Sequence, residues 1–197
     1  IEIFTASCSR LGLQKKSQPT LPPDTIDVWE PNYDFVIGHV QMASLPRNNG
    51  YATVYFSFGG YSSNGYSLGT SVTEGNFYSY TPVQVRQQIL DALRRWSGVV
   101  KINFVEVQPS YTNIMLIKGD LGNSGALASS GFSNHSSIIF NTGTTSFLTI
   151  DDVGYTATHE IGHSLGLDHS DVTDAIMAPR IVRGQGAELK QDDINGI

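Results

Sequence analysis

The feature that most constrains how this 197-residue chain can fold is a closely spaced set of histidines near its C-terminal end. Residues 153–169 read VGYTATHEIGHSLGLDH, so His159 and His163 are four residues apart and His169 follows six residues later. On an α-helix, residues four apart lie on one face, separated by about 6 Å along the axis at ~1.5 Å per residue. The spacing therefore predicts a helix that carries two imidazoles on the same face.

Gly166 explains how the third histidine can join the first two. A histidine one turn further along the same helix would recede along the axis. Glycine adopts a left-handed conformation at little cost, so we expect Gly166 to end the helix and turn the chain until His169 faces the same point. At the other end, Asp151 or Asp152 is expected to cap the helix. Three neutral imidazoles suit tetrahedral zinc and leave a fourth position for water, which is typical of catalytic sites.

Glu160 directly follows the first histidine and is expected to point slightly round the same helix, within reach of water. There it would take a proton as the water attacks a carbonyl and pass that proton to the leaving amine. A positioned general base of this kind contributes about 10²–10⁴-fold to the rate. A single histidine would more often simply pack or cap, but the complete HExxHxxGxxH spacing favours a hydrolytic zinc site.

Composition narrows the choice of partners. The net charge is −6 and no run of Lys or Arg occurs, which argues against nucleic acid or an anionic membrane as the main partner. No stretch approaches the ~18–20 continuous apolar residues of a membrane span. Cys8 is the one cysteine, so an internal disulfide is excluded. The sequence does not indicate an oligomeric state.

Local patterns predict a mixed sheet with helices packed on it, an α+β fold. Residues 51–58 (YATVYFSF) are typical of a strand. A helix is expected after Thr81 as the N-cap, with Pro82 at its first position, Gln84 completing a capping box and Gly98 ending it. Strands are also expected at 99–107, 113–117 and 137–140, a short segment at 126–129, and a helix at the end of the chain.

The first fifty residues differ from the rest. They carry little periodicity, and Pro19, Pro22 and Pro23 indicate an extended arm. We expect 1–50 to form an N-terminal arm or extension, with a pro-segment as one interpretation, and 51–197 to form a catalytic domain. The chain begins without a methionine, which we interpret as a processed or trimmed form.

The motif and its surroundings resemble a known clan of enzymes. HEIGHSLGLDH followed by Met177 resembles the metzincin zinc metallopeptidases. Ser170, directly after the third histidine, and DAIMAP at 174–179 are similar to the matrixins, the matrix metalloproteinases. Pro179 stands where serralysins and astacins place a tyrosine zinc ligand. The ending LKQDDINGI at 189–197 is similar to the last helix of a matrixin catalytic domain.

This resemblance implies a metzincin fold, with a twisted mixed β-sheet, an active-site helix, a backing helix and a C-terminal helix. It also implies a secreted, extracellular endopeptidase that uses one catalytic zinc and acts on proteins or peptides. Met177 would form a hydrophobic floor beneath the zinc. Leu127 and Ala128 would pair with an extended substrate along a strand edge. Pro179 and Ile181 would belong to the wall of the pocket that receives the residue after the scissile bond.

The chain departs from the matrixin pattern at the family's second metal. Ser129 and Ile139 fall where matrixins usually carry two histidines of a structural zinc site, so one zinc is expected. His135 lies nearby, and we interpret it as a loop histidine. A calcium site is compatible with the resemblance, but no residue pattern supports one.

Two other functions fit part of the pattern. A catalytically inactive zinc-binding module that recognises peptides would need the histidines but not Glu160. A zinc hydrolase of non-peptide amides would need all four residues. The resemblance favours the endopeptidase, which would hydrolyse peptide bonds with a zinc-activated water and Glu160 as the general base.

Overall fold

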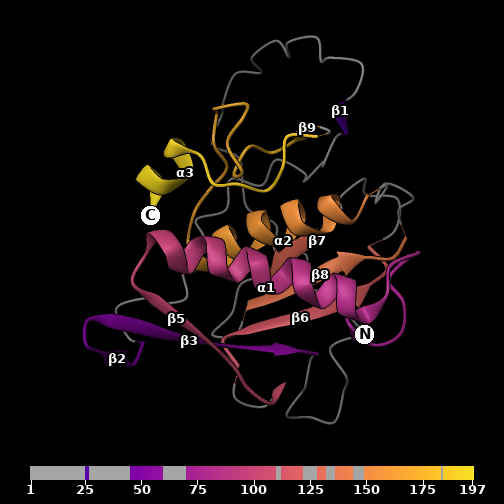
Figure 1. The fold of residues 1–197 in the computed structure, drawn as a ribbon, viewed down its shortest axis with the longest axis horizontal. Coiled ribbons are helices and arrows are strands. Elements are labelled where there is room, and N and C mark those ends of the chain that lie inside the picture. Colours follow the sequence, from indigo (N-terminus) through magenta and orange to yellow (C-terminus); the bar gives the residue numbers. More distant parts are fainter. Residues whose placement is uncertain are drawn as a thin grey trace, which may run out of the picture.

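The computed structural model of the chain describes residues 25–26, 45–59, 70–109, 112–121, 128–131, 136–143, 149–182 and 184–197. Figure 1 shows α1 and α2 lying side by side on one face of the main sheet, with α3 and β9 beyond α2. None of the helices in the described ranges combines the length and apolar character that a membrane crossing requires. The elements are β1 (Thr25–Ile26), β2 (Arg47–Asn48), β3 (Tyr51–Phe58), β4 (Thr70–Ser71), α1 (Pro82–Val99), β5 (Ile102–Glu106), β6 (Ile114–Gly119), β7 (Ala128–Gly131), β8 (Ser136–Asn141), α2 (Ile150–Leu165), β9 (Ile181–Val182) and α3 (Gln191–Gly196).

Within the described ranges, the main sheet has seven strands of mixed direction. Its path runs β2-β3-β6-β8-β7, while β5 pairs with β3 and β4 pairs with β6. Strand β3 is parallel to β5 and β6, and β6 is parallel to β8. Strand β7 is antiparallel to β8 and ends the described path. This arrangement, with helices on one face, confirms the predicted α+β fold.

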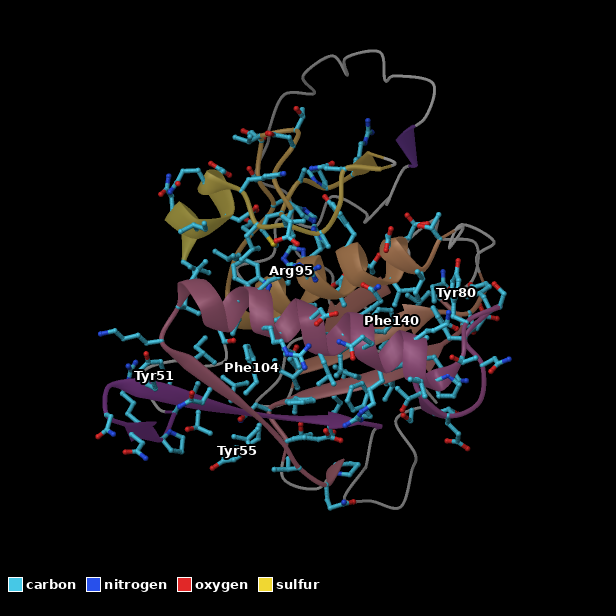
Figure 2. The ribbon with its side chains drawn as sticks, in the orientation of Figure 1. Tyr51, Tyr55, Tyr80, Arg95, Phe104 and Phe140 are labelled. Carbon is cyan, nitrogen blue, oxygen red and sulfur yellow. The ribbon has the colours of Figure 1, made fainter. Side chains whose placement is uncertain are left out.

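Alternation along β3 explains which face of the sheet packs on the helices. Ala52, Val54 and Phe56 are buried in the core, whereas Tyr51 is 41% exposed. Successive side chains of a strand point to opposite faces, so every second residue enters the core. In Figure 2, Tyr55 lies on the side of the sheet away from the helices.

Helix α1 begins as the sequence predicts and ends later. The Gln84 backbone N–H donates to Thr81 Oγ1 at 3.4 Å, and the Thr81 N–H donates to Gln84 Oε1 at 2.9 Å, which completes the capping box. The prediction that Gly98 ends the helix was wrong. The helix runs on to Val99, and the Val100 N–H donates to the Trp96 carbonyl at 3.0 Å. Glycine in a helix interior costs only ~0.5–1 kcal/mol, which the packing of this helix outweighs.

The predicted N-cap of α2 was also wrong. Thr149 occupies that position, where its hydroxyl accepts from the Asp152 N–H at 3.2 Å. The Asp152 carboxylate accepts in turn from the Thr149 N–H at 2.8 Å. The aspartate therefore serves as the third residue of a capping box rather than as the cap itself.

Polar side chains fix α2 between α1 and the sheet. Trp96 of α1 is fully buried, and its indole Nε1–H donates to the Thr158 carbonyl at 2.8 Å. On the sheet side, Ser136 and Ser164 lie 2.9 Å apart, oxygen to oxygen, and both are buried. Both contacts are hydrogen bonds between buried groups, and hydrogen bonds depend on direction. They therefore fix the rotation of α2 about its axis.

Gly162 marks a close approach of Met177 and Trp96 to α2. A Cβ atom added there would lie 2.4 Å from Met177 Sδ and 2.9 Å from Trp96 Cζ2. We therefore expect Gly162→Ala to lower the free energy of unfolding by about 1–3 kcal/mol, the usual cost of overpacking a core. Urea unfolding at a fixed zinc concentration measures this change.

Gly98→Ala is the matched control, because a Cβ at that exposed helical position would meet nothing within 4 Å. It should raise stability by about 0.5–1 kcal/mol through the better helix propensity of alanine. Equal effects of the two substitutions would mean that the approach at Gly162 is not tight.

Candidate metal centre

Three imidazole rings converge beside the C-terminal half of α2. The Nε2 atom of His163 lies 2.9 Å from that of His159 and 3.2 Å from that of His169. Across the ranges that the structure describes, these residues form the one group of three or more His, Cys, Asp or Glu side chains close enough to hold a metal ion. They are the three histidines that the sequence analysis predicts as metal ligands.

Backbone carbonyls set the protonation of two of these rings. His159 Nδ1 donates to the Ile176 carbonyl at 2.7 Å, and His163 Nδ1 donates to the Leu167 carbonyl at 2.8 Å. A neutral imidazole carries one N–H, so a proton on Nδ1 leaves a lone pair on Nε2. Such a hydrogen bond from the second ring nitrogen is typical of histidines that bind metals.

The geometry of the lone pairs fits zinc. Facing Nε2 atoms without protons repel one another, and a cation between them removes that repulsion. Zn–N bonds of ~2.0–2.1 Å in a tetrahedral site place ligand nitrogens roughly 3.3 Å apart. The separations of 2.9 and 3.2 Å lie close to this value. The three nitrogen donors therefore fit a zinc ion.

Burial keeps the rings in the neutral form that binds metal. Desolvation lowers the pKa of His163 to about 4, and the nearby His169 acts in the same direction. Desolvation and the neighbouring histidines hold the pKa of His159 well below its usual value. His169 is the most exposed of the three, yet the protein around its ring still lowers its pKa by desolvation, against the opposing charge of Asp168. Deprotonated imidazole is the form that coordinates.

The predicted turn at Gly166 is confirmed. Gly166 has φ 106° and ψ 9°, in the left-handed region. Its N–H donates to the His163 carbonyl at 2.9 Å, and the Leu167 N–H donates to the Gly162 carbonyl at 3.0 Å. This pair of bonds is a Schellman motif. The same turn therefore redirects the chain toward His169 and supplies the Leu167 carbonyl that orients His163.

The segment 174–179, which we call the Met-turn, lies directly under α2. Met177 is 2% exposed and is the side chain nearest to Gly162. The Ser170 N–H donates to the Met177 carbonyl at 2.8 Å, so the loop that carries His169 is bonded to this turn. These contacts are compatible with Met177 as a floor beneath the three rings.

Sequence reasoning missed the residue that holds the Met-turn in place. Asp193 of α3 is 2% exposed, and its carboxylate accepts from the N–H groups of Ile176 at 3.0 Å, Met177 at 2.9 Å and Lys190 at 2.7 Å. The sequence predicted a helix at the end of the chain, in which Asp193 is the second of two successive aspartates. Nothing in that pattern pointed to a turn sixteen residues earlier.

Glu160 is fully buried on α2, next to His159. The hydroxyl of Ser164 donates to the Glu160 carbonyl at 3.0 Å, which leaves Ser136 of β8 to donate to Ser164. The backbone of Glu160 is therefore connected to the sheet through two buried serines. Its catalytic role remains a prediction.

Of the two residues predicted to bind substrate along a strand edge, the structure describes only one. Leu127 lies outside the described residues. Ala128 begins β7, the last strand of the described path. Ser129 and Ile139, the positions at which the sequence led us to expect no second zinc site, are direct partners across β7 and β8. His135 and Cys8 lie outside the described residues, so the single zinc and the role of the arm remain predictions.

The segment from Pro179 to Glu188 contacts two distant parts of the chain. Pro179 is exposed, and Ile181 of β9 pairs in antiparallel register with Ile26 of β1. Arg95 Nε of α1 donates to Glu188 Oε1 at 3.3 Å. Because Glu188 is exposed, this ion pair contributes little, about 0–1 kcal/mol. It nevertheless places the segment against α1.

We expect Asp193→Asn to lower the free energy of unfolding by about 1–3 kcal/mol, because the amide cannot accept all three N–H bonds and leaves a buried donor unsatisfied. Chemical denaturation of the zinc-free protein measures the change. Asp192→Asn is the matched control, since this exposed neighbour accepts from the Ser170 hydroxyl and, among the described residues, from no buried N–H group. If Asn at the two positions had the same small effect, Asp193 would not be the anchor of the Met-turn.

Comparison with known proteins adds an independent line of evidence. The matrixin family matches residues 68–197. Interstitial collagenase of Bos taurus is 32% identical over 137 residues, which is 60% of this chain and 29% of that protein. Stromelysin-3 of Rattus norvegicus is 35% identical over 130 residues, 58% and 26% of the two chains. Metalloendoproteinase 5-MMP of Arabidopsis thaliana is 56% identical over 50 residues, which is 25% of this chain and 14% of that protein. The chain thus spans less than a third of the length of each of these relatives.

Proposed function

This chain belongs to the matrixin family of metallopeptidases, and from that premise we propose that it is a zinc-dependent endopeptidase acting on proteins outside the cell. The observation that carries the proposal is the convergence of three histidine Nε2 atoms, two of which belong to rings whose Nδ1 donates to a backbone carbonyl. Residues 51–197 would form the catalytic domain. The family uses zinc, and His159, His163 and His169 are the residues that would hold it.

The chemistry divides between the ion and the chain. When bound, zinc acts as a Lewis acid toward a carbonyl and allows water to serve as a nucleophile near neutral pH. His159 and His163 hold their Nε2 lone pairs in place because their Nδ1 protons already donate to backbone carbonyls. Glu160, on the same helix, would take the proton that the water gives up and return it to the leaving amine. Met177 would close the site from below.

Substrate would lie along the edge of β7. An extended peptide that pairs with a strand edge gains affinity through main-chain hydrogen bonds, and its side chains can then enter pockets. The place of β7 at the end of the described strand path supports Leu127 and Ala128 as such an edge. Pro179, the last residue of the Met-turn, and Ile181, which lies two residues later, would form the wall of the pocket after the scissile bond.

A catalytically inactive zinc-binding module that recognises peptides is the alternative from a different class. Glu160 argues against it, because a module that only binds has no need of a buried carboxylate beside its metal ligands. Turnover of a denatured protein by the zinc-loaded chain distinguishes the two functions.

Replacing Glu160 with Gln should leave zinc binding intact and reduce kcat by about 10²–10⁴-fold, since the amide keeps the shape of the side chain but cannot take a proton. Zinc content is measured by elemental analysis and rate by hydrolysis of a quenched peptide. His163→Gln is the contrasting variant, which should lose zinc itself. A Glu160→Gln enzyme with wild-type kcat would disprove the proposed base.

Digestion of a peptide library should show a preference for a sizeable apolar side chain directly after the scissile bond. The expected pocket wall is formed by Pro179 and Ile181, and burial of an apolar side chain contributes about 1.5–3 kcal/mol. Mass spectrometry of the products gives the preference. A uniform preference for charged residues at that position would contradict this assignment of the pocket.

A further inference from the structure

Tyr155 is a buried polar residue that the proposed chemistry does not use. It lies one turn before His159 on α2 and is 3% exposed. Residues four apart share a helix face, so its ring projects toward the same side as the imidazole. Its hydroxyl reaches the Met-turn, where it donates to the carbonyls of Ala175 and Ile176, both at 3.2 Å.

Two successive peptide units of the Met-turn are held from both sides. In the first, the Ala175 carbonyl accepts from Tyr155 and the Ile176 N–H donates to Asp193. In the second, the Ile176 carbonyl accepts from Tyr155 and His159, while the Met177 N–H donates to Asp193. A hydroxyl on the carbonyl side and a carboxylate on the N–H side therefore fix the rotation of these peptides.

The Ile176 carbonyl connects this arrangement to the metal centre. A carbonyl oxygen has two lone pairs, so it can accept from Tyr155 and from His159 at once. Burial, with the charge of Asp193 as a second cause, raises the pKa of Tyr155, and the hydroxyl remains a donor. Rotation of this peptide would move the acceptor of His159 Nδ1 and thereby the direction of its Nε2 lone pair. Outer-shell partners of metal ligands typically affect metal affinity about 10–100-fold.

We propose that Tyr155 is a positioning residue for the metal centre, whose hydroxyl fixes the Ile176 carbonyl that orients His159. This inference rests on the proposed function in that it takes His159 as a zinc ligand. It assigns a role to a residue on the ligand helix that touches neither substrate nor metal. A residue that only packed the core would affect stability but not the orientation of one particular imidazole.

The test is Tyr155→Phe, which removes the hydroxyl and keeps the buried ring. Zinc affinity, measured by competition with a chelator, should fall by about tenfold, the lower end of the range for outer-shell partners because Tyr155 acts one step further out. In the zinc-loaded protein, NMR should show the Nδ1 proton of His159 exchanging with solvent severalfold faster than in the wild type. The Nδ1 proton of His163, which bonds to Leu167 instead, should not change, and it serves as a control within the same molecule.

Thr112→Val is the matched control variant. Its buried hydroxyl also donates to two carbonyls, those of Tyr55 at 3.2 Å and Ile114 at 2.6 Å, but on the sheet. It should lower stability without changing zinc affinity. If both variants bound zinc as tightly as the wild type, or if both imidazole protons exchanged faster together in Tyr155→Phe, the positioning role would be overturned.

A measurement on the wild type keeps the inference testable if Tyr155→Phe does not fold. Coupling between two sites is reciprocal, so zinc binding should slow the exchange of the Tyr155 hydroxyl proton. Identical exchange in the zinc-free and zinc-loaded protein would refute the coupling. A wild-type chain that bound no zinc would instead refute the proposed function, so the two failures are distinguishable.

Discussion

The structure depends on keeping three nitrogen lone pairs directed at one point, an arrangement that is electrostatically unfavourable until a cation lies between them. For His159 and His163 the protein achieves this on the opposite side of the ring, where the Nδ1 proton donates to a backbone carbonyl. One carbonyl, at Leu167, is local, because the turn that ends the helix creates it. The other, at Ile176, comes from a segment seventeen residues from His159 and must be held there by tertiary contacts.

Those tertiary contacts explain why the surroundings of α2 are so polar for a buried helix. A purely apolar helix surface would permit small rotations and shifts, because apolar contacts have little directional preference. Hydrogen bonds from Trp96 on one side and between Ser136 and Ser164 on the other remove that freedom. Gly162 then allows Met177 of the Met-turn to approach the helix that carries His159 and His163 with no side chain between them.

Local chemistry was predictable from the sequence, and long-range partners were not. The capping box at Thr81, the turn at Gly166 and the convergence of the histidines all follow from spacing within a few residues. The errors at Gly98 and at the start of α2 were also local: packing outweighed the propensity of one glycine, and Thr149 shares the cap with Asp152. Asp193 and Tyr155 could not be found in this way, because their partners are fixed only by the folded chain, although Tyr155 stands at helical spacing from His159.

The hydrogen bonds that Asp193 accepts also couple the local unfolding of two parts of the chain, the Met-turn and α3. Native proteins open locally in cooperative units, and an amide exchanges with solvent only when the unit that contains it opens. One carboxylate accepts from Ile176 and Met177 in the turn and from Lys190 at the start of the six-residue helix α3. These three amides therefore belong to a single opening event. A helix too short to be stable alone and a turn with no secondary structure acquire a shared local stability through one buried side chain.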